Sequence, residues 1–326
     1  AAQAPADRSV FIGSSEVMAR IHRTIGSVAR SMATVFVTGE SGTGKELAAV
    51  AVHARSSRAT GPFIALNCGA IPPDLLESEV FGHMKGSFTG AISDKPGAAA
   101  AADGGTLFLD EICEMALPLQ TKLLRFLQTS TIQPVGSTRP RKVNVRIICA
   151  TNRDPMDYVR RGLFREDLFY RLYVVPIHMP PLRERGADVI EVAEAALARF
   201  SAEEGKDFSG LSDATRAFLL AQDWPGNVRQ LLNVIRNLVV LNEGGLVTPE
   251  MLPAGMATNT LPLDLTDRLA VSPLTAHPRT LAQIERQAIE AALARNDSSV
   301  PATARELDIS PSTLYRKLEA WGSKRR

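Results

Sequence analysis

The chain has 326 residues, of which 45% are hydrophobic and 22% charged, with 37 Lys and Arg against 35 Asp and Glu. This balance excludes a largely disordered chain and is typical of a globular protein with roughly two or three domains. No apolar run reaches the ~20 residues that cross a bilayer, so we expect a cytoplasmic protein without a membrane partner.

Residues 1–10 contain neither an initiator Met nor a secretory signal, which predicts a residual linker from a longer protein. Cys68, Cys113 and Cys149 stand far apart in hydrophobic surroundings, so we expect buried thiols and neither a disulfide framework nor a Cys-rich zinc site. The five histidines lack the spacing of metal ligands.

Residues 11–180 alternate strand and helix patterns. Short apolar, β-rich runs predict strands at 33–39, 62–68, 105–112, 143–151 and 173–179, and helical patterns at 45–54 and 118–128 lie between them. Strands that alternate with helices predict an α/β domain whose mostly parallel sheet is covered by helices on both faces.

Beyond Pro180 we expect no further strands. Apolar residues at three- and four-residue intervals predict helices at 187–204, 211–222 and 227–242, so 181–252 is predicted to be an all-helical subdomain. Residues 253–279 carry four prolines without periodicity, which favours a flexible linker.

The third predicted module, 280–326, holds eight Lys or Arg against six Asp or Glu, and this difference equals the net charge of the whole chain, +2. Its pattern predicts a helix-turn-helix. A first helix has an apolar face formed by Leu281, Ile284, Ala288 and Ala292. Two short helices, "VPATAREL" and "DISPSTLYRKLEAW", follow around a turn at Asp308 and Ile309.

In the last helix Ser310 is a good N-cap and Pro311 suits the first position. Spacing by four and three residues places Leu314, Leu318 and Trp321 inward. The opposite face is predicted to meet DNA through Ser312, Thr313, Arg316 and Lys317. The alternative is the polar end of a helical bundle.

The stretch "GESGTGKE", 39–46, fits a phosphate-binding loop between a strand and a helix. The predicted loop consists of Gly39, Glu40, Ser41, Gly42, Thr43, Gly44, Lys45 and Glu46. Its backbone N–H groups would cradle the β-phosphate of a nucleotide, and the Lys45 ammonium would reach the β and γ oxygens. Glu46 stands where the general pattern has Ser or Thr as a magnesium ligand, so another oxygen is needed.

Asp110 and Glu111 supply carboxylates at the end of "GGTLFLDEI". Asp110 is predicted to bind Mg²⁺ through water, and Glu111 to orient and deprotonate the attacking water. Together with the phosphate-binding loop, the pair predicts ATP hydrolysis.

Hydrolysis also needs positive charge near the γ-phosphate. "FREDLFYRL" offers Arg165 and Arg171, which could equally be surface ion-pair partners of Glu166 and Asp167. Arg229, after a predicted turn at 224–226, could sense the phosphates from the helical subdomain.

"GHMKGSFTGA", 82–91, holds Phe88 and Thr89 between small residues and glycines. Such a loop either displays an apolar side chain to a partner or forms a turn whose ring tucks into the core. The predicted contact segment consists of Gly86, Ser87, Phe88, Thr89, Gly90 and Ala91.

Read in order, these segments resemble bacterial enhancer-binding proteins, the AAA+ ATPases that activate RNA polymerase carrying sigma-54. The likeness covers nearly all 326 residues, and "GSFTGA" resembles the GAFTGA loop with which that class contacts sigma-54. The resemblance implies an AAA+ P-loop parallel sheet sandwiched by helices, an α-helical lid and an all-α helix-turn-helix domain of the Fis type. It also implies ATP and Mg²⁺ as cofactors and, as partners, enhancer DNA, sigma-54 polymerase and further copies of the chain, from a dimer to a hexameric or heptameric ring.

The same resemblance implies residue roles. Asn67 would be a switch that restrains Glu111, Thr151 and Asn152 would form the first sensor, and Arg165 and Arg171 would reach into a neighbouring subunit's site. In that class the residue after the P-loop lysine is also Glu, as at Glu46. Ser87 replaces the usual Ala of the loop, and Asp308 replaces the usual Gly of the helix-turn-helix.

The wording of "HMKGSFTGA", "GGTLFLDEICEM", "ICATNRDP" and "SAEEGK" is most similar to LuxO-type quorum-sensing response regulators, which carry a receiver domain ahead of the ATPase. Two alternatives stay open. One is a DNA-binding AAA+ regulator that does not remodel sigma-54, and the other is a replication-type AAA+ ATPase with an appended DNA-binding domain.

Overall fold

The computed structural model describes residues 11–88, 90–253, 289, 292, 293, 295, 296, 299–307 and 309–321. The chain divides into two compact units, with a boundary after Leu261, and each is described by itself. No helix in the described ranges is long and apolar enough to cross a membrane.

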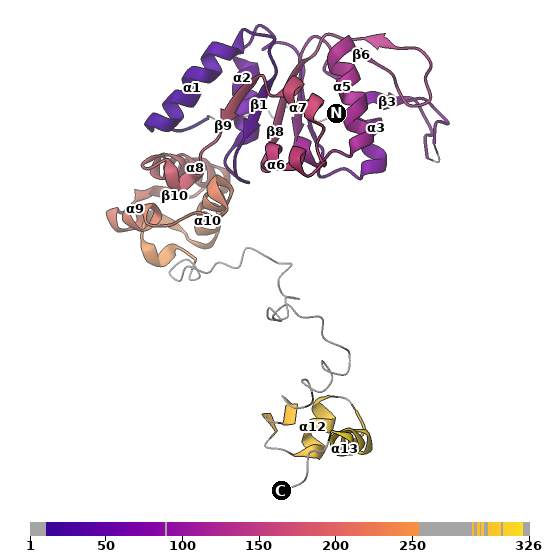
Figure 1. Ribbon diagram of the computed structural model, residues 1–326. Helices are drawn as coiled ribbons and strands as arrows, with labels where there is room; N and C mark the ends of the chain where they lie inside the picture. Colours follow the sequence, from indigo (N-terminus) through magenta and orange to yellow (C-terminus); the bar gives the residue numbers. More distant parts are fainter. Residues whose placement is uncertain are drawn as a thin grey trace. The chain divides into compact units, whose positions relative to one another are not determined.

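A five-stranded parallel sheet organises the first unit (Figure 1). The strand order is β2-β5-β8-β1-β9. The strands are β1 (Val35–Thr38), β2 (Phe63–Asn67), β5 (Thr106–Asp110), β8 (Arg146–Thr151) and β9 (Val175–His178). Because all five run in one direction, their carboxyl ends share one edge, where ligands of open α/β sheets bind.

Helices cover both faces of this sheet, as the sequence predicts (Figure 1). Val35 and Val37 of β1 pack with α1 (Glu16–Ala29) and α2 (Lys45–Ala54) in one core, whereas Phe36 belongs to the core on the opposite face. That second core includes buried residues of α3 (Pro73–Phe81), α4 (Ala98–Ala101), α5 (Leu117–Thr129) and α7 (Glu166–Leu172). The alternation of side chains along a strand therefore places two apolar layers, one on each face.

Local sequence signals account for several helix ends. The Ser15 side chain accepts a hydrogen bond from the Met18 N–H and caps α1. At the other end of α1, the buried Arg146 donates to the carbonyl oxygens of Val28 (2.9 Å) and Ala29 (2.6 Å). Asp154 caps α6 (Pro155–Arg160), whose first residue is proline. Each contact satisfies backbone groups that a helix end leaves without partners.

Two short antiparallel hairpins project from the α/β core. One joins β3 (Gly82–His83) to β4 (Lys95–Pro96), and the other joins β6 (Thr131–Ile132) to β7 (Arg141–Lys142). The Val135 N–H donates to Gly82 O and the Met84 N–H donates to Val135 O, both at 2.9 Å. The two hairpins therefore support each other.

The prediction that strands end at Pro180 is wrong. Besides α8 (Asp188–Glu204), α9 (Asp213–Leu220) and α10 (Asn227–Leu241), this region contains a parallel two-stranded sheet. Its strands are β10 (Asp207–Leu211), which precedes α9, and β11 (Gly244–Val247), which follows α10. The sequences of these strands, "DFSGL" and "GGLV", are short and glycine-rich, and glycine is disfavoured within strands, so they give no strand signal. The three lid helices themselves were predicted within a few residues of their observed ends.

In the second unit, α12 (Val300–Glu306) and α13 (Pro311–Ala320) pack around Ala304 and Leu314. Ser310 caps α13 by accepting from the Thr313 N–H, and Pro311 is in the first turn, as predicted. Leu318 and Trp321 pack against the same core, which confirms their inward orientation. Ala292 is buried, whereas Leu281, Ile284, Ala288 and Asp308 lie outside the described residues. So do the predicted linker 1–10 and, except for its first residue, the predicted linker 253–279.

Candidate functional site

The phosphate-binding loop follows β1 and ends at α2, in the predicted strand-to-helix context. Gly39, Gly42 and Gly44 have φ values of 148°, 78° and 95°. A Cβ at Gly39 would lie 2.5 Å from Met179 O, and one at Gly42 would lie 2.4 Å from Gly226 O. Glycine is therefore required twice over at Gly39 and Gly42, by the positive φ and by the close approach of neighbouring backbone.

The same loop presents donors suited to phosphate. Within the described part of the chain, the backbone N–H groups of residues 42–45 donate to no other group, and they lie at the N-terminus of α2. The buried Lys45 ammonium donates to Gly39 O (3.0 Å) and Glu40 O (3.2 Å). Burial lowers the pKa of Lys45, and the nearby carboxylates of Glu111 and Asp110 partly oppose this. This combination fits a nucleotide's β- and γ-phosphates.

Asp110 and Glu111 lie where β5 ends, at the carboxyl edge of the sheet. Glu111 has left-handed backbone, with φ 51° and ψ 46°. Its N–H donates to Asp110 Oδ1 (3.0 Å), and its own Oε2 accepts from the Asn152 N–H (3.2 Å). Burial raises the pKa of Glu111, the hydrogen bond from Asn152 lowers it, and the charge of Asp110 adds to the rise. A carboxylate with a raised pKa is a stronger base for water.

Asn67 and Thr151 also end strands at this edge. Asn67 is paired with Asp110 in the β2–β5 register, but its Oδ1 accepts from the N–H groups of Gly69 (2.9 Å) and Ala70 (3.0 Å). The implied switch role would require a hydrogen bond between Asn67 and Glu111. The structure shows none between these two described side chains. Thr151 is buried and its hydroxyl accepts from the Arg153 N–H (3.1 Å).

Polar side chains of the lid contact the phosphate-binding loop, and three of them reach Glu40 or Ser41. Arg229 Nη1 donates to Ser41 Oγ (2.9 Å), which places the predicted lid arginine at the loop. Asn227 Nδ2 donates to Glu40 Oε2 and Ser41 O, both at 3.0 Å. Arg183 donates to both oxygens of Glu40, at 2.6 and 3.0 Å. Hydrogen bonds from Arg183 and Asn227 lower the pKa of Glu40 to about 2.

Sequence reasoning missed Asn227 and Arg183. Asn227 is buried with φ 52°, and its Oδ1 also accepts from the Leu182 N–H (2.8 Å). Asn tolerates left-handed backbone better than most residues, and here it follows Pro-Gly, a turn signal. This pattern could have indicated a special backbone position at Asn227. No short-range pattern marks Arg183, because its partner Glu40 lies far away in sequence.

The two candidate finger arginines stand at opposite ends of α7 and are not brought together. Arg165 forms a two-pronged ion pair with Asp167, with N–O distances of 3.0 and 2.7 Å. Arg171 Nη2 donates to Leu127 O (3.1 Å) at the end of α5. Within a single subunit, Arg165 therefore forms the surface ion pair that the sequence left open as an alternative to the finger role.

The GSFTGA segment forms the tip between β3 and β4. The Gly86 N–H donates to Ala91 O (2.8 Å), and Gly86 and Gly90 have φ values of 79° and 108°. The Phe88 side chain is 37% exposed, and its ring meets His83 edge-on at 5.0 Å between centroids. Phe88 is thus held at the surface and is not part of either sheet core. Thr89 lies outside the described residues.

Ser87 lies on the inner side of the same segment. Its hydroxyl is buried and has no hydrogen-bond partner among the described residues. A Cβ at Gly136, in the second hairpin, would stand 2.7 Å from Ser87 Cβ. The two hairpins therefore touch at Ser87 and Gly136.

The remaining predicted contacts lie on α13. Ser312 and Arg316 are exposed, while Thr313 and Lys317 are half-buried. The Thr313 hydroxyl lies 2.8 Å from Ser310 Oγ, so it takes part in the helix cap. No cluster of three or more His, Cys, Asp or Glu side chains forms a metal site in the described ranges, and all three cysteines are buried as expected.

Comparisons with known proteins agree with this geometry. Residues 11–178 match the sigma-54 interaction domain, residues 183–265 the AAA+ ATPase lid domain, and residues 280–321 the Fis family of bacterial regulatory proteins. The predicted AAA+ sheet, its lid and the Fis-type helix-turn-helix are thereby confirmed.

Two regulators illustrate the likeness. Regulatory protein LuxO of Vibrio cholerae is 57% identical over 318 residues, which cover 96% of this chain and 70% of LuxO. Regulatory protein AtoC of Escherichia coli is 42% identical over 314 residues, covering 96% of this chain and 68% of AtoC. The solved structure of NtrX from Brucella abortus in complex with ATP has a TM-score of 0.68 and 35% identity, covering 96% of this chain and 69% of NtrX.

Proposed function

The chain belongs to the family of sigma-54-dependent transcription activators with an AAA+ nucleotide-binding domain, and we propose that it converts ATP hydrolysis into remodelling of sigma-54 RNA polymerase. In this proposal the Fis-type domain binds enhancer DNA and the ATPase drives a closed promoter complex to the open state. The single observation that carries it is the pairing of two surfaces on one domain: a phosphate-binding loop facing two carboxylates, and a Phe88 tip held out by two joined hairpins.

Hydrolysis would use residues at the carboxyl edge of the sheet. The free N–H groups of residues 42–45 and the Lys45 ammonium would hold the phosphates, and Arg229 would approach them from the lid. Glu111 would accept a proton from the attacking water, helped by its raised pKa. Asp110 would hold Mg²⁺, which supplies positive charge against the phosphate oxygens.

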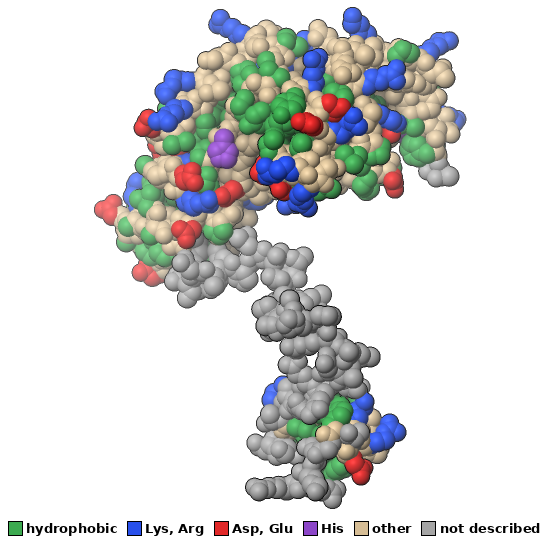
Figure 2. Space-filling view, viewed as in Figure 1, with side chains coloured by type: hydrophobic (Ala, Val, Ile, Leu, Met, Phe, Trp, Pro, Cys, Tyr) green, Lys and Arg blue, Asp and Glu red, His purple; other side chains and the backbone are tan. Residues whose placement is uncertain are grey.

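A ring would follow if each ATP site were shared between two neighbouring subunits. Arg165 is exposed and is held by Asp167, so it could exchange that partner for the γ-phosphate of a neighbour's nucleotide. Figure 2 shows hydrophobic side chains gathered over α7, where Tyr170, Tyr173 and Val174 are exposed. An apolar surface of this kind beside the loop would be covered when a second copy docks.

Upstream control is proposed by analogy with response regulators of the LuxO type, in which a receiver domain precedes the ATPase. On this proposal the chain is the output part of a two-component system, and a quorum-sensing input is one form of it. The alternative of a regulator that does not remodel sigma-54 predicts that the Phe88 tip is dispensable.

Phe88→Ala tests the proposal against that alternative. The substitution should leave ATP turnover nearly intact and lower the free energy of unfolding by only about 1 kcal/mol, since the ring makes one edge-on aromatic contact. It should abolish capture of sigma-54 and formation of open complexes at a sigma-54 promoter. Melting temperature, ATPase rate and sigma-54 binding are measured on the same preparation.

Ile92→Ala is the matched control, because Ile92 is 83% exposed on the same hairpin but lies outside the GSFTGA segment. It should behave like the unaltered chain in all three assays. Equal sigma-54 capture by both variants would contradict the assigned role of the loop, and a joint loss of folding and ATPase activity would place Phe88 in the core.

A further inference from the structure

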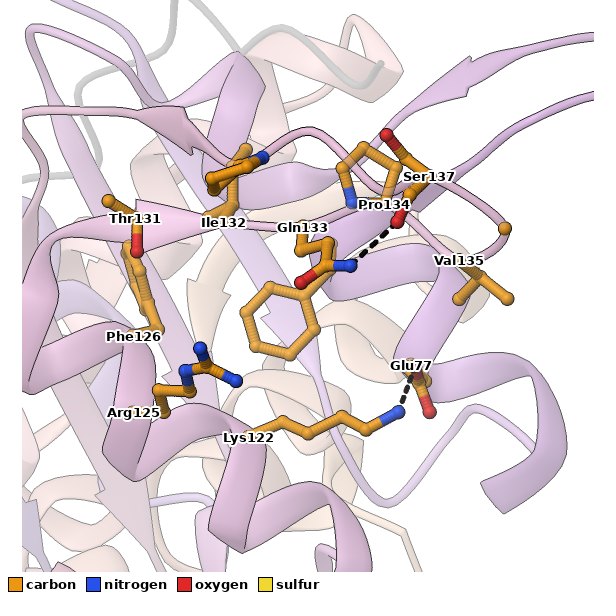
Figure 3. A pocket seen from close by; sticks show the side chains of 13 residues that line it. Glu77, Lys122, Arg125, Phe126, Thr131, Ile132, Gln133, Pro134, Val135 and Ser137 are labelled. Atoms are coloured by element: carbon orange, nitrogen blue, oxygen red, sulfur yellow. Dashed lines mark hydrogen bonds and ion pairs between the residues drawn. The ribbon is translucent and has the colours of Figure 1, made fainter.

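A pocket separate from the nucleotide site lies at the base of the two hairpins (Figure 3). Its volume is about 300 Å³, and its walls come from α3, α5 and the segment 131–140. Phe81, Phe126 and Ile132 give it a buried apolar floor. The volume lies at the lower end of the range for small-molecule sites, so the pocket suits a ligand of one ring or a short chain.

The charges around this pocket are unequal. Lys122 is paired with Glu77, so these two side chains neutralise each other. Arg125, one turn further along α5, also lines the pocket, and its guanidinium has no ion pair or hydrogen bond within the described part of the chain. Figure 3 shows Lys122 reaching Glu77 while Arg125 extends from α5 without a partner. One net positive charge therefore faces the pocket.

The wall opposite α5 is already shaped. Gln133 Nε2 donates to Ser137 O (2.6 Å), which closes the turn between β6 and β7 around the pocket (Figure 3). The fold therefore supplies an apolar floor, a fixed wall and one unpaired fork of N–H donors. Guanidinium forks match the geometry of carboxylate and phosphate oxygens.

We propose that this pocket binds a small organic anion, with a carboxylate or phosphate on Arg125 and an apolar group against Phe126 and Ile132. The bound anion would also contact the segment that supports the output loop. Val135 lines the pocket and exchanges two backbone hydrogen bonds with Gly82 and Met84. The anion would therefore reinforce the contact between the hairpins.

Binding of three small aromatic probes to the full chain tests the proposal by calorimetry, with saturating ADP to fill the phosphate-binding loop. Benzoate and phenyl phosphate carry the two anionic groups, and benzamide is the neutral control. At least one anion should bind, and the one that binds identifies the preferred group. Failure of both anions to bind, or equal affinity for benzamide, would overturn the proposal.

Variants then locate the site. Arg125→Gln should weaken binding about tenfold or more, the loss expected for a charge-assisted hydrogen bond. Lys122→Gln should also weaken binding, because it leaves the Glu77 carboxylate unpaired at the rim. Arg23→Gln removes an exposed charge from α1 and should change nothing. Unaltered affinity in Arg125→Gln would show that the anion binds elsewhere.

Hydrogen exchange supplies a readout independent of affinity. The anion should slow exchange in peptides that cover 131–137 and 82–88, since Met84 N–H is bonded to Val135 O. Peptides that cover 39–46 should be unaffected under saturating ADP. Protection confined to 39–46 would assign the binding to the nucleotide loop and refute the pocket.

Discussion

Glu111 stands in a left-handed backbone conformation that residues other than glycine rarely adopt. The turn directs its side chain so that Oε2 meets the Asn152 N–H at the end of the neighbouring strand. Strain of this kind costs about 1–3 kcal/mol and persists where the surrounding structure holds it. Here the left-handed turn points two adjacent carboxylates in different directions, since Asp110 ends the strand and Glu111 turns away from it.

If Glu111 is the general base, its raised pKa should set the acid limit of ATP turnover. Below its pKa the side chain is protonated and cannot accept a proton from water, so activity should fall at a pH above the ordinary glutamate value of 4.5. Glu114→Gln should move this limb to lower pH, because the Glu114 charge contributes to the rise. Rates of ATP turnover across the pH range check this, with Glu79→Gln, which removes a carboxylate paired with Lys95, as the control. A limb that stays fixed in Glu114→Gln would argue against Glu111 as the base.

The first turn of α10 joins the lid to the phosphate-binding loop. Asn227 joins three segments, because it accepts from Leu182 and donates to Glu40 and Ser41. One buried amide therefore bonds the phosphate-binding loop and two parts of the lid together. The two-stranded sheet of β10 and β11 closes the far side of the same lid core.

Asn227→Ala should lower the free energy of unfolding more than Asn227→Gly. Both substitutions leave the buried Leu182 N–H without its partner, a loss of about 1–3 kcal/mol. Alanine adds the cost of left-handed backbone, about 1–2 kcal/mol, which glycine avoids. Denaturant unfolding of the two variants measures the difference. Equal stability of Asn227→Ala and the unaltered chain would mean that the lid does not depend on this residue.

The exposed face of α13 is expected to read DNA. If Arg316 contacts a base edge, Arg316→Ala should cost about 1–3 kcal/mol at a selected cognate site and little on random DNA. Titrations on both DNAs measure this difference. Equal weakening on both would show that Arg316 contacts only phosphate.

The elements most accurately predicted are those with local signals. The phosphate-binding loop and α2 follow from glycine spacing after an apolar strand, and the α13 cap follows from Ser310 and Pro311. The ribbon of β10 and β11 could not be predicted, because its pairing joins residues far apart and its glycines weaken strand propensity. Arg183 was missed for the same reason, since what defines it is contact with Glu40, which lies far away in the sequence.

The activity of the proposed ATPase depends on which partner Arg165 engages. A single subunit places Lys45, Asp110 and Glu111 together but engages Arg165 with its own Asp167. An arginine that stabilises the transition state must therefore change partner or come from another copy. If the arginine comes from another copy, ATP turnover should rise with protein concentration.

Mixed assemblies test this dependence. Arg165→Ala should lower ATP turnover by about 10³-fold or more if Arg165 acts as a finger. Adding inactive Glu111→Gln subunits should restore part of the activity, because some interfaces then combine an intact Arg165 with an intact Glu111. Turnover is measured across mixing ratios at constant total protein. Absence of rescue at every ratio would place Arg165 in its own subunit's site.

The contact between Ser87 and Gly136 couples two stretches of sequence that lie far apart in the chain. A side chain at Gly136 would collide with Ser87, and the φ of 81° at Gly136 already favours glycine. A larger residue at position 136 would therefore require a compensating change at Ser87, so we expect substitutions at these two positions to be coupled. The buried Ser87 hydroxyl lacks a partner among the described residues, and an unsatisfied buried hydroxyl costs free energy. Ser87 is therefore the position where a paired substitution should gain most stability.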